Sequence, residues 1–149
     1  MRLWHYKMIP VLPKPQLLAQ WREAQLIING ELEDKPVHHI LIDYIYSCPK
    51  KDLAIYTYIV LQEMRNRNWK IGNETFDRFE SYYKSVGFEA YDLSGISENN
   101  FSSTFLKYQN NRYFMQCFYN LQEKYDRGQE GFYAEDYNNL VLLKERIIY

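Results

Sequence analysis

Residues 16–28 read QLLAQWREAQLII, and the spacing of their apolar side chains decides the fold class. Four of them recur at intervals of four, three and four residues: Leu17, Trp21, Ala24 and Ile28. This is the period of one face of an α-helix, and the glycine that follows, Gly30, predicts where the helix ends. The stretch therefore predicts an amphipathic helix with a single buried stripe.

The same period recurs further along the chain. It predicts helices over four more ranges: 53–69, 73–87, 110–128 and 134–148. Asp52 is the expected N-cap of the first of these. Residues 37–46, VHHILIDYIY, favour a helix, although their β-branched side chains also allow a strand, and residues 91–105 are expected to form the longest loop. The expected fold is all-α, a single compact domain of about five or six helices over residues 1–149.

The composition is typical of a globular protein without a membrane span. The 149 residues are 46% hydrophobic and 17% aromatic, which suffices for one core. No apolar run approaches the ~20 residues that cross a bilayer, and the first residues lack the apolar segment of a signal peptide, so a cytoplasmic location is expected. Cys48 and Cys117 lack the spacing of a zinc site; they are expected to be reduced thiols, and no metal is expected.

Charge is unevenly divided along the chain. The net charge is −1, but residues 1–72 carry +3 and residues 73–149 carry −4, so a polyanion is expected to meet the first half. Within that half the segment RNRNWK combines cations with an aromatic ring, and its candidate DNA contacts are Arg65, Arg67, Trp69 and Lys70. The alternative is that these cations meet a helix macrodipole while the tryptophan packs on the core.

An adjacent arginine and glutamate, Arg22 and Glu23, lie on the polar side of the first predicted helix. On a helical projection Ala19 lies between them, and so small a side chain leaves room for a ligand. Two interpretations stay open from the residues alone. The pair belongs to a solvated helix face, which is the ordinary place for charges, or it forms part of a binding site.

The opening residues 1–27, MRLWHYKMIPVLPKPQLLAQWREAQLI, resemble the N-terminal segment of the pyrimidine-dimer DNA glycosylase family, of the phage endonuclease V type. They are more closely similar to a bacterial branch that begins MRLWH, and the resemblance weakens but persists over about the first 70 residues. It implies an endonuclease V-like helical fold and no cofactor. It also implies a catalytic glutamate at Glu23 and a phosphate-binding arginine at Arg22.

The family has two further functional residues near the start of the chain that this sequence lacks, and Gln16, at one of these positions, is itself a candidate DNA contact. Gln16 stands where the family has a histidine, and Leu26 stands where it has a second arginine. His5 and His39 are shared with the bacterial branch; they are candidates to gather near Glu23 as acid–base partners or as a weak metal site, and both are candidate DNA contacts. The alternative for both histidines is a structural hydrogen bond, and their spacing carries no metal signature.

The family's chemistry starts from an N-terminal amine. α-Amino groups titrate near pH ~8, far below lysine amines, so a neutral, nucleophilic fraction exists under physiological conditions. In the family the amine belongs to a small second residue that is exposed when the initiator methionine is removed. Here the bulky Arg2 stands at that position, and the available amine is that of Met1. The resemblance assigns to Glu23 the stabilisation of the cationic sugar and iminium intermediates.

Together these features predict a DNA-repair glycosylase with AP-lyase activity on damaged pyrimidines in duplex DNA. The catalytic candidates are Met1, Arg2 and Glu23. The alternative is a non-catalytic helical module that keeps the scaffold and binds another protein or itself, which the acidic second half favours. The two differ in whether the protein binds duplex DNA with an affinity that falls as salt rises.

Overall fold

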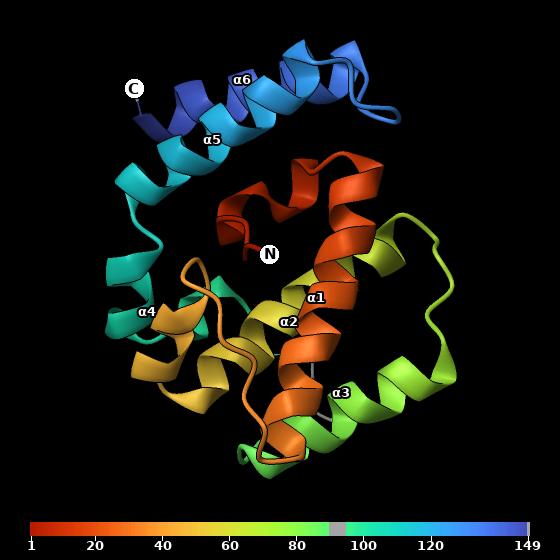
Figure 1. The fold of residues 1–149 in the computed structure, drawn as a ribbon, viewed down its shortest axis with the longest axis vertical. Coiled ribbons are helices and arrows are strands. Elements are labelled where there is room, and N and C mark those ends of the chain that lie inside the picture. Colours follow the sequence, from red (N-terminus) through yellow and green to blue (C-terminus); the bar gives the residue numbers. More distant parts are fainter. Residues whose placement is uncertain (90–94, 149) are drawn as a thin grey trace.

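Helices supply all the regular secondary structure in residues 1–89 and 95–148, the part of the chain that the computed structural model describes (Figure 1). The α-helices are α1 (Lys14–Leu32), α2 (Lys50–Asn66), α3 (Asn73–Ser85), α4 (Ser103–Tyr108), α5 (Asn111–Asp126) and α6 (Ala134–Ile148). Short 3₁₀-helices lie between them: η1 (Tyr6–Val11), η2 (Asp43–Ser47) and η3 (Glu98–Asn100). The predicted all-α fold class is confirmed, and five of the α-helices are long.

The helices pack around the N-terminal segment. α1 contacts α2 and α3, α5 pairs with α6, and η1 contacts both α2 and α6. Figure 1 shows the start of the chain in the middle of the molecule, between α1 and the α5–α6 pair. Large aromatic rings fill the interior, among them the fully buried Tyr56, Phe105 and Phe114. The fold therefore surrounds the chain start with helices that are far from it in sequence.

α1 confirms the predicted stripe but not the predicted end. Leu17, Ala24 and Ile28 are fully buried and Trp21 nearly so. The helix continues through Gly30, where a Cβ atom would lie only 2.7 Å from the carbonyl oxygen of Lys35. It ends instead at Leu32, with Glu33 as its C-cap, and Asp34, with a φ of 55°, turns the chain. The Lys35 N–H then donates to the Gly30 oxygen at 2.8 Å, as in a Schellman motif. Because Gly30 has no Cβ atom, the chain after α1 can pass close to the helix at this position.

Two other local predictions, for residues 37–46 and for Asp52, are corrected. In the range 37–46 the turn before Asp43 is irregular and only the η2 residues are helical, because the side chains of Asp43 and His39 accept hydrogen bonds from the N–H groups of His39 and Leu41. Ile40 is consequently exposed instead of joining an apolar stripe. Asp52 is not an N-cap, since α2 begins two residues earlier. Its buried carboxylate accepts hydrogen bonds from the N–H and the hydroxyl of Ser102, at 2.9 and 2.6 Å.

The predicted loop over 91–105 contains two helical segments. Residues 91–94 lie outside the described residues, but η3 and the first turn of α4 fall within the range. Ser97 and Ser102 accept hydrogen bonds from N–H groups at the starts of these helices, which explains why a serine- and asparagine-rich stretch becomes helical. The predicted helices over 53–69, 73–87, 110–128 and 134–148 correspond to α2, α3, α5 and α6.

Candidate active site

Side chains from distant helices fasten the backbone of the first residues. The fully buried Gln20 on α1 accepts a hydrogen bond from the Trp4 N–H at 2.7 Å and donates to the Arg2 oxygen at 3.0 Å. Tyr56 on α2 donates to the Trp4 oxygen at 2.6 Å, and Tyr113 on α5 donates to the Leu3 oxygen. Because each of these backbone groups has a partner, the chain start can be buried without loss of hydrogen bonding.

Gln109 holds the next part of the segment. Its amide oxygen accepts from the Tyr6 N–H at 2.7 Å, and its amide nitrogen donates to the Tyr44 hydroxyl at 2.9 Å. The backbone oxygen of the same residue lies 2.9 Å from Nε2 of His5. Two of these contacts therefore tie the turn between α4 and α5 to the N-terminal segment, and the third ties it to η2.

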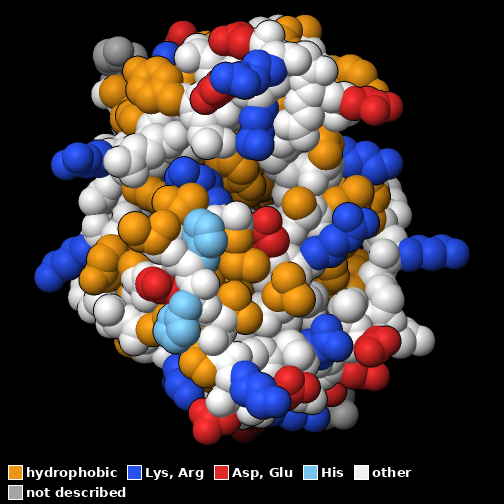
Figure 2. All heavy atoms as spheres, in the orientation of Figure 1, with side chains coloured by type: hydrophobic (Ala, Val, Ile, Leu, Met, Phe, Trp, Pro, Cys, Tyr) orange, Lys and Arg blue, Asp and Glu red, His pale blue; other side chains and the backbone are white. Residues whose placement is uncertain are grey.

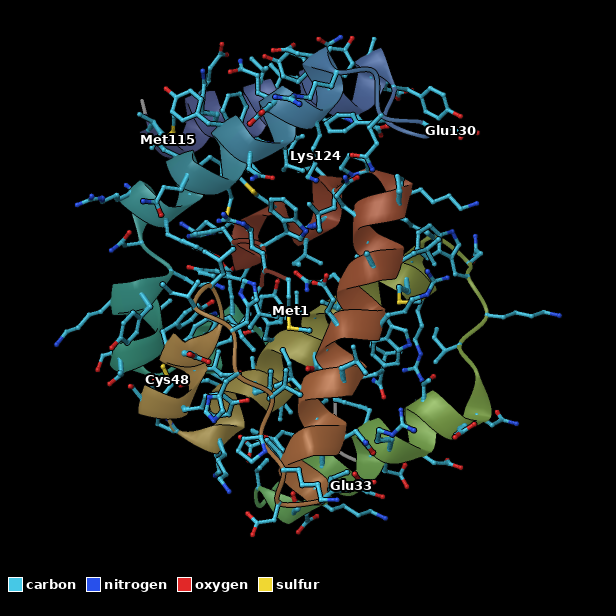
Figure 3. All side chains as sticks on the ribbon, viewed as in Figure 1. Met1, Glu33, Cys48, Met115, Lys124 and Glu130 are labelled. Carbon is cyan, nitrogen blue, oxygen red and sulfur yellow. The ribbon has the colours of Figure 1, made fainter. Side chains whose placement is uncertain are left out.

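A cavity of about 330 Å³ opens beside the first residues of this segment. Its walls come from the chain start, from α1, from α5 and the loop after it, and from one residue before η2. The lining residues are Met1, Arg2, Trp4, Pro15, Gln16, Ala19, Glu23, Leu41, Asn120, Lys124 and Gln129. Figure 3 shows Met1 beside α1 and Lys124 extending from α5 on the other side of the chain start. The structure thus brings Met1, Arg2, Gln16 and Glu23 to one cavity.

Glu23 is the acidic residue of this cavity. Its side chain is half-buried, and Oε2 lies 3.4 Å from the amide nitrogen of Gln20. The same Gln20 amide nitrogen donates to the backbone of Arg2, so one side chain links the position of the carboxylate to that of the chain start. Ala19 also lines the cavity, in agreement with the space that its small side chain was expected to leave. Met1 and the Glu23 carboxylate line one cavity, and an amine at Met1 would suit nucleophilic attack with a charge stabiliser on the same cavity wall.

Arg2 is held by aromatic rings. Its guanidinium carbon lies 5.7 Å from the ring centre of Trp4 and 5.9 Å from that of Tyr113, and a guanidinium nitrogen lies 3.9 Å from Sγ of Cys117. Burial raises the pKa values of the Cys117 thiol and the Tyr113 hydroxyl, which favours their neutral forms. Cation–π contacts of this kind hold the Arg2 guanidinium between Trp4 of the N-terminal segment and Tyr113 of α5, so its bulk anchors the chain start.

Gln16 and Arg22 occupy different environments. Gln16 is 5% exposed, and its amide nitrogen donates to Oε1 of Gln129 at 2.7 Å. Its own Oε1 has no hydrogen-bond partner within the described residues, which leaves a buried acceptor beside the cavity. Arg22 is exposed on the outer side of α1 and is not among the lining residues. It is free to reach a phosphate outside the cavity.

His5 is built into the interior. The ring is 1% exposed; Nδ1 accepts from the Lys7 N–H at 3.2 Å, and Nε2 lies within hydrogen-bond distance of the Gln109 oxygen. Burial lowers its pKa from 6.5 to about 4, with a smaller contribution from the Lys7 charge. His5 therefore makes the structural hydrogen bonds that were its alternative interpretation, and in this arrangement it presents no surface to DNA.

This burial predicts a pH dependence of stability. The unfolded histidine takes up a proton near pH 6.5 and the folded one only near pH 4. The stabilisation from the neutral ring is therefore complete above pH 6.5 and disappears as the pH falls to 4, a loss of up to about 3 kcal/mol. Urea unfolding across this window should show a smaller loss for His5→Gln, which keeps an amide donor for the Gln109 oxygen. Equal losses in the two proteins would contradict the assignment.

The remaining candidate contacts lie outside the cavity. His39 sits on an exposed turn, and its Nδ1 accepts from the Leu41 N–H at 3.1 Å. Arg67 is engaged by the protein, because one guanidinium nitrogen donates to the Leu12 oxygen at 2.8 Å and to the Pro10 oxygen at 3.3 Å. Trp69 is half-buried against the core, with the Lys14 amine 5.9 Å from its ring centre. Arg65 and Lys70 are exposed.

The surface charge is mixed. Figure 2 shows Lys and Arg side chains interspersed with Asp and Glu side chains on the face that carries the chain start. Among the described residues, no three metal-binding side chains gather into a cluster. Within the same residues, no helix has both the length and the apolar character that crossing a bilayer requires.

Sequence reasoning missed the contributions of the C-terminal half. Asn120 and Lys124 stand four residues apart and so face the same side of α5, and Gln129 follows in the next loop. That spacing identifies a shared helix face, but only the packing of α5 over the chain start turns the face toward the cavity. The role of Gln20 as a link between Arg2 and Glu23 was also missed.

Comparison with known proteins identifies one family for this chain. The model of the family described as "Pyrimidine dimer DNA glycosylase" matches residues 1–77, the part that contains the chain start, α1 and α2. No curated protein and no solved structure gives a match. The matched region includes Met1, Arg2, Gln16 and Glu23, whereas the α5 wall of the cavity lies beyond it.

Proposed function

The chain belongs to the pyrimidine dimer DNA glycosylase family, and on that premise we propose that it releases damaged pyrimidines from duplex DNA and cleaves the resulting abasic site. In this proposal the amine of Met1 is the nucleophile and Glu23 is its catalytic carboxylate. The supporting observation is that both residues line one cavity while Gln20 links their positions.

The proposed reaction begins at the sugar. The neutral amine attacks C1′ of the damaged nucleotide, a nitrogen–carbon bond forms, and the bond to the base breaks as the base leaves with the electron pair and takes up a proton. The Glu23 carboxylate takes a proton from the attached amine and passes it to O4′ as the C1′–O4′ bond breaks, which opens the sugar ring and gives a protonated imine. The Glu23 carboxylate stabilises this positive charge, which is the main electrostatic requirement of the step.

Strand cleavage follows from the same intermediate. Removal of a proton from C2′ by Glu23 breaks the C3′–oxygen bond and releases the 3′ phosphate as the leaving group. Water then hydrolyses the imine and returns the free amine of Met1. Every step uses groups already present in the cavity, together with water.

Either the damaged nucleotide or its partner base must leave the base stack before the amine can reach the sugar. A nucleotide inside a duplex does not present its sugar carbon to a side chain in a pocket, so extrusion precedes chemistry. Exposed cations near the cavity suit contacts with the phosphates beside the extruded nucleotide, namely Arg22 on α1 and Lys124 on α5. Arg65 and Lys70 are proposed as more distant backbone contacts.

Borohydride trapping tests this function directly. Purified protein is incubated with duplex DNA that contains an abasic site or a cyclobutane pyrimidine dimer, and the imine is reduced to a stable adduct. The expected result is a covalent complex on both substrates, with the cross-linked peptide mapped to Met1 by mass spectrometry. Undamaged duplex is the control. Folded protein that forms no adduct on either substrate would refute the proposal.

Lys124 makes the peptide map necessary, because it brings a second amine to the same cavity. Lys124→Gln is expected to keep the adduct at Met1 and to bind DNA more weakly at moderate salt, since one phosphate contact is removed. An adduct that maps to Lys124 in the wild-type protein and disappears in this variant would assign the nucleophile to α5 instead.

A further inference from the structure

Two neighbouring apolar side chains stand on the turn before η2, which contributes one wall residue to the cavity. Ile40 is 87% exposed, and Leu41 is 38% exposed and lines the cavity together with Met1 and Glu23. In Figure 1 the segment after α1 returns along that helix and turns beside the chain start. Figure 2 shows exposed histidine side chains close to apolar ones near the middle of this face. The turn therefore projects apolar surface at the place where a substrate has to enter.

The turn is held in one shape by its own hydrogen bonds. The Asp43 carboxylate accepts from the His39 N–H at 2.9 Å, and the His39 oxygen accepts from the N–H groups of Ile42 and Asp43, both at 2.9 Å. Ile42 is fully buried and fixes the turn to the core. Ile40 consequently sits at the tip of a short, braced turn and needs no rearrangement to project from it.

We propose that Ile40 and Leu41 form a wedge that enters the base stack of duplex DNA beside the extruded nucleotide. The proposal rests on the proposed function, because it requires a duplex from which the damaged nucleotide or its partner has been extruded at the cavity. A single exposed isoleucine is ordinary on a protein surface. Here two apolar side chains lie together on a braced turn, and one of them also forms the cavity wall.

The physical advantage of such a wedge lies in the vacancy that extrusion creates. Moving a nucleotide out of the duplex removes its stacking contacts and exposes apolar faces of the neighbouring bases to water. An aliphatic side chain that fills this gap restores contact with those faces and opposes the return of the nucleotide. Because Leu41 borders the cavity, Ile40 at the adjacent tip is the residue that reaches into the stack.

The test compares substrates that differ in how far the stack is already open. One duplex carries a single abasic site; the other carries the same site inside a three-nucleotide bulge. Ile40→Ser removes the apolar tip from a side chain that makes little contact with the fold, and Ile40→Leu keeps it. The matched control is Leu142→Ser, which changes a residue that is 55% exposed on α6.

The expected result is a selective loss on the stacked duplex. Single-turnover cleavage by Ile40→Ser should fall about tenfold on that duplex and remain unchanged on the bulge, where no stack has to be opened. A 2-aminopurine placed beside the site should brighten when the wild-type protein or Ile40→Leu binds, and much less with Ile40→Ser. Leu142→Ser should behave as wild type in each assay.

The outcomes separate the wedge from the chemistry. Equal cleavage of both substrates by Ile40→Ser and wild type, with equal 2-aminopurine emission, would overturn the wedge and leave the proposed function intact. Equal losses on the duplex and the bulge would also overturn it, since the residue would then affect more than stack opening. Wild-type protein that cleaves neither substrate would refute the proposed function, and the wedge with it.

Discussion

Replacing Glu23 with glutamine is expected to slow strand cleavage at an abasic site by about 10²–10⁴-fold, the usual contribution of a catalytic acid or base. The amide has nearly the same shape and retains a contact with Gln20, but it carries no charge to stabilise the imine and accepts no proton from C2′. Single-turnover cleavage of an abasic duplex measures the effect. Affinity for the same duplex should change little, because Glu23 lies in the cavity and not on the outer face of α1.

Glu33→Gln provides the matched control for this experiment. Both glutamates belong to α1 or its C-cap, but Figure 3 shows Glu33 at the C-terminal end of the helix, away from Met1. The control removes the same charge from the protein without touching the cavity, so it should cleave at the wild-type rate. Cleavage by Glu23→Gln within a few-fold of wild type would exclude the proposed role of the carboxylate.

The part of the site that comes from α1 could be predicted, because helical geometry is local. The spacing of Leu17, Trp21, Ala24 and Ile28 fixes which side of α1 faces the core, and it follows that Glu23 lies off that stripe. The proximity of Glu23 to Met1 came only from the family resemblance. No periodicity specifies how an extended chain start folds back along the helix that follows it.

The structural predictions that failed depended on signals with two meanings. A glycine after an amphipathic segment marks a helix end or a close packing contact, and Gly30 proved to be the second, while Asp34 made the turn. Residues 37–46 have apolar side chains at helical spacing, yet Ile40 is exposed, because tertiary packing selects only some of them for burial. The α5 wall could not be predicted, since it depends on contacts between residues about a hundred positions apart.

Three glutamines of α1 are buried, which the helical spacing of its apolar residues does not predict. Gln16, Gln20 and Gln25 are all at most 5% exposed, although glutamine is ordinarily a surface residue. They differ in what their amides contact. Gln20 serves Arg2, Trp4 and Glu23, whereas neither amide atom of Gln25 has a hydrogen-bond partner in the described part of the chain. The same residue type therefore has opposite energetic consequences at two positions of one helix.

Gln20→Leu is accordingly expected to destabilise the protein by about 2–4 kcal/mol, because the Trp4 N–H and the Arg2 oxygen lose their buried partner. Gln25→Leu, a chemically identical change, should be neutral or stabilising, since it buries apolar surface in place of an unpaired amide. Urea unfolding followed by tryptophan fluorescence measures both. A similar change in the free energy of unfolding for the two substitutions would show that Gln20 stabilises the protein by filling space and not by its hydrogen bonds. If the Gln20 hydrogen bonds instead fix the chain start against Glu23, the Gln20→Leu protein that remains folded should also lose trapping at Met1, while Gln25→Leu should trap as efficiently as wild type.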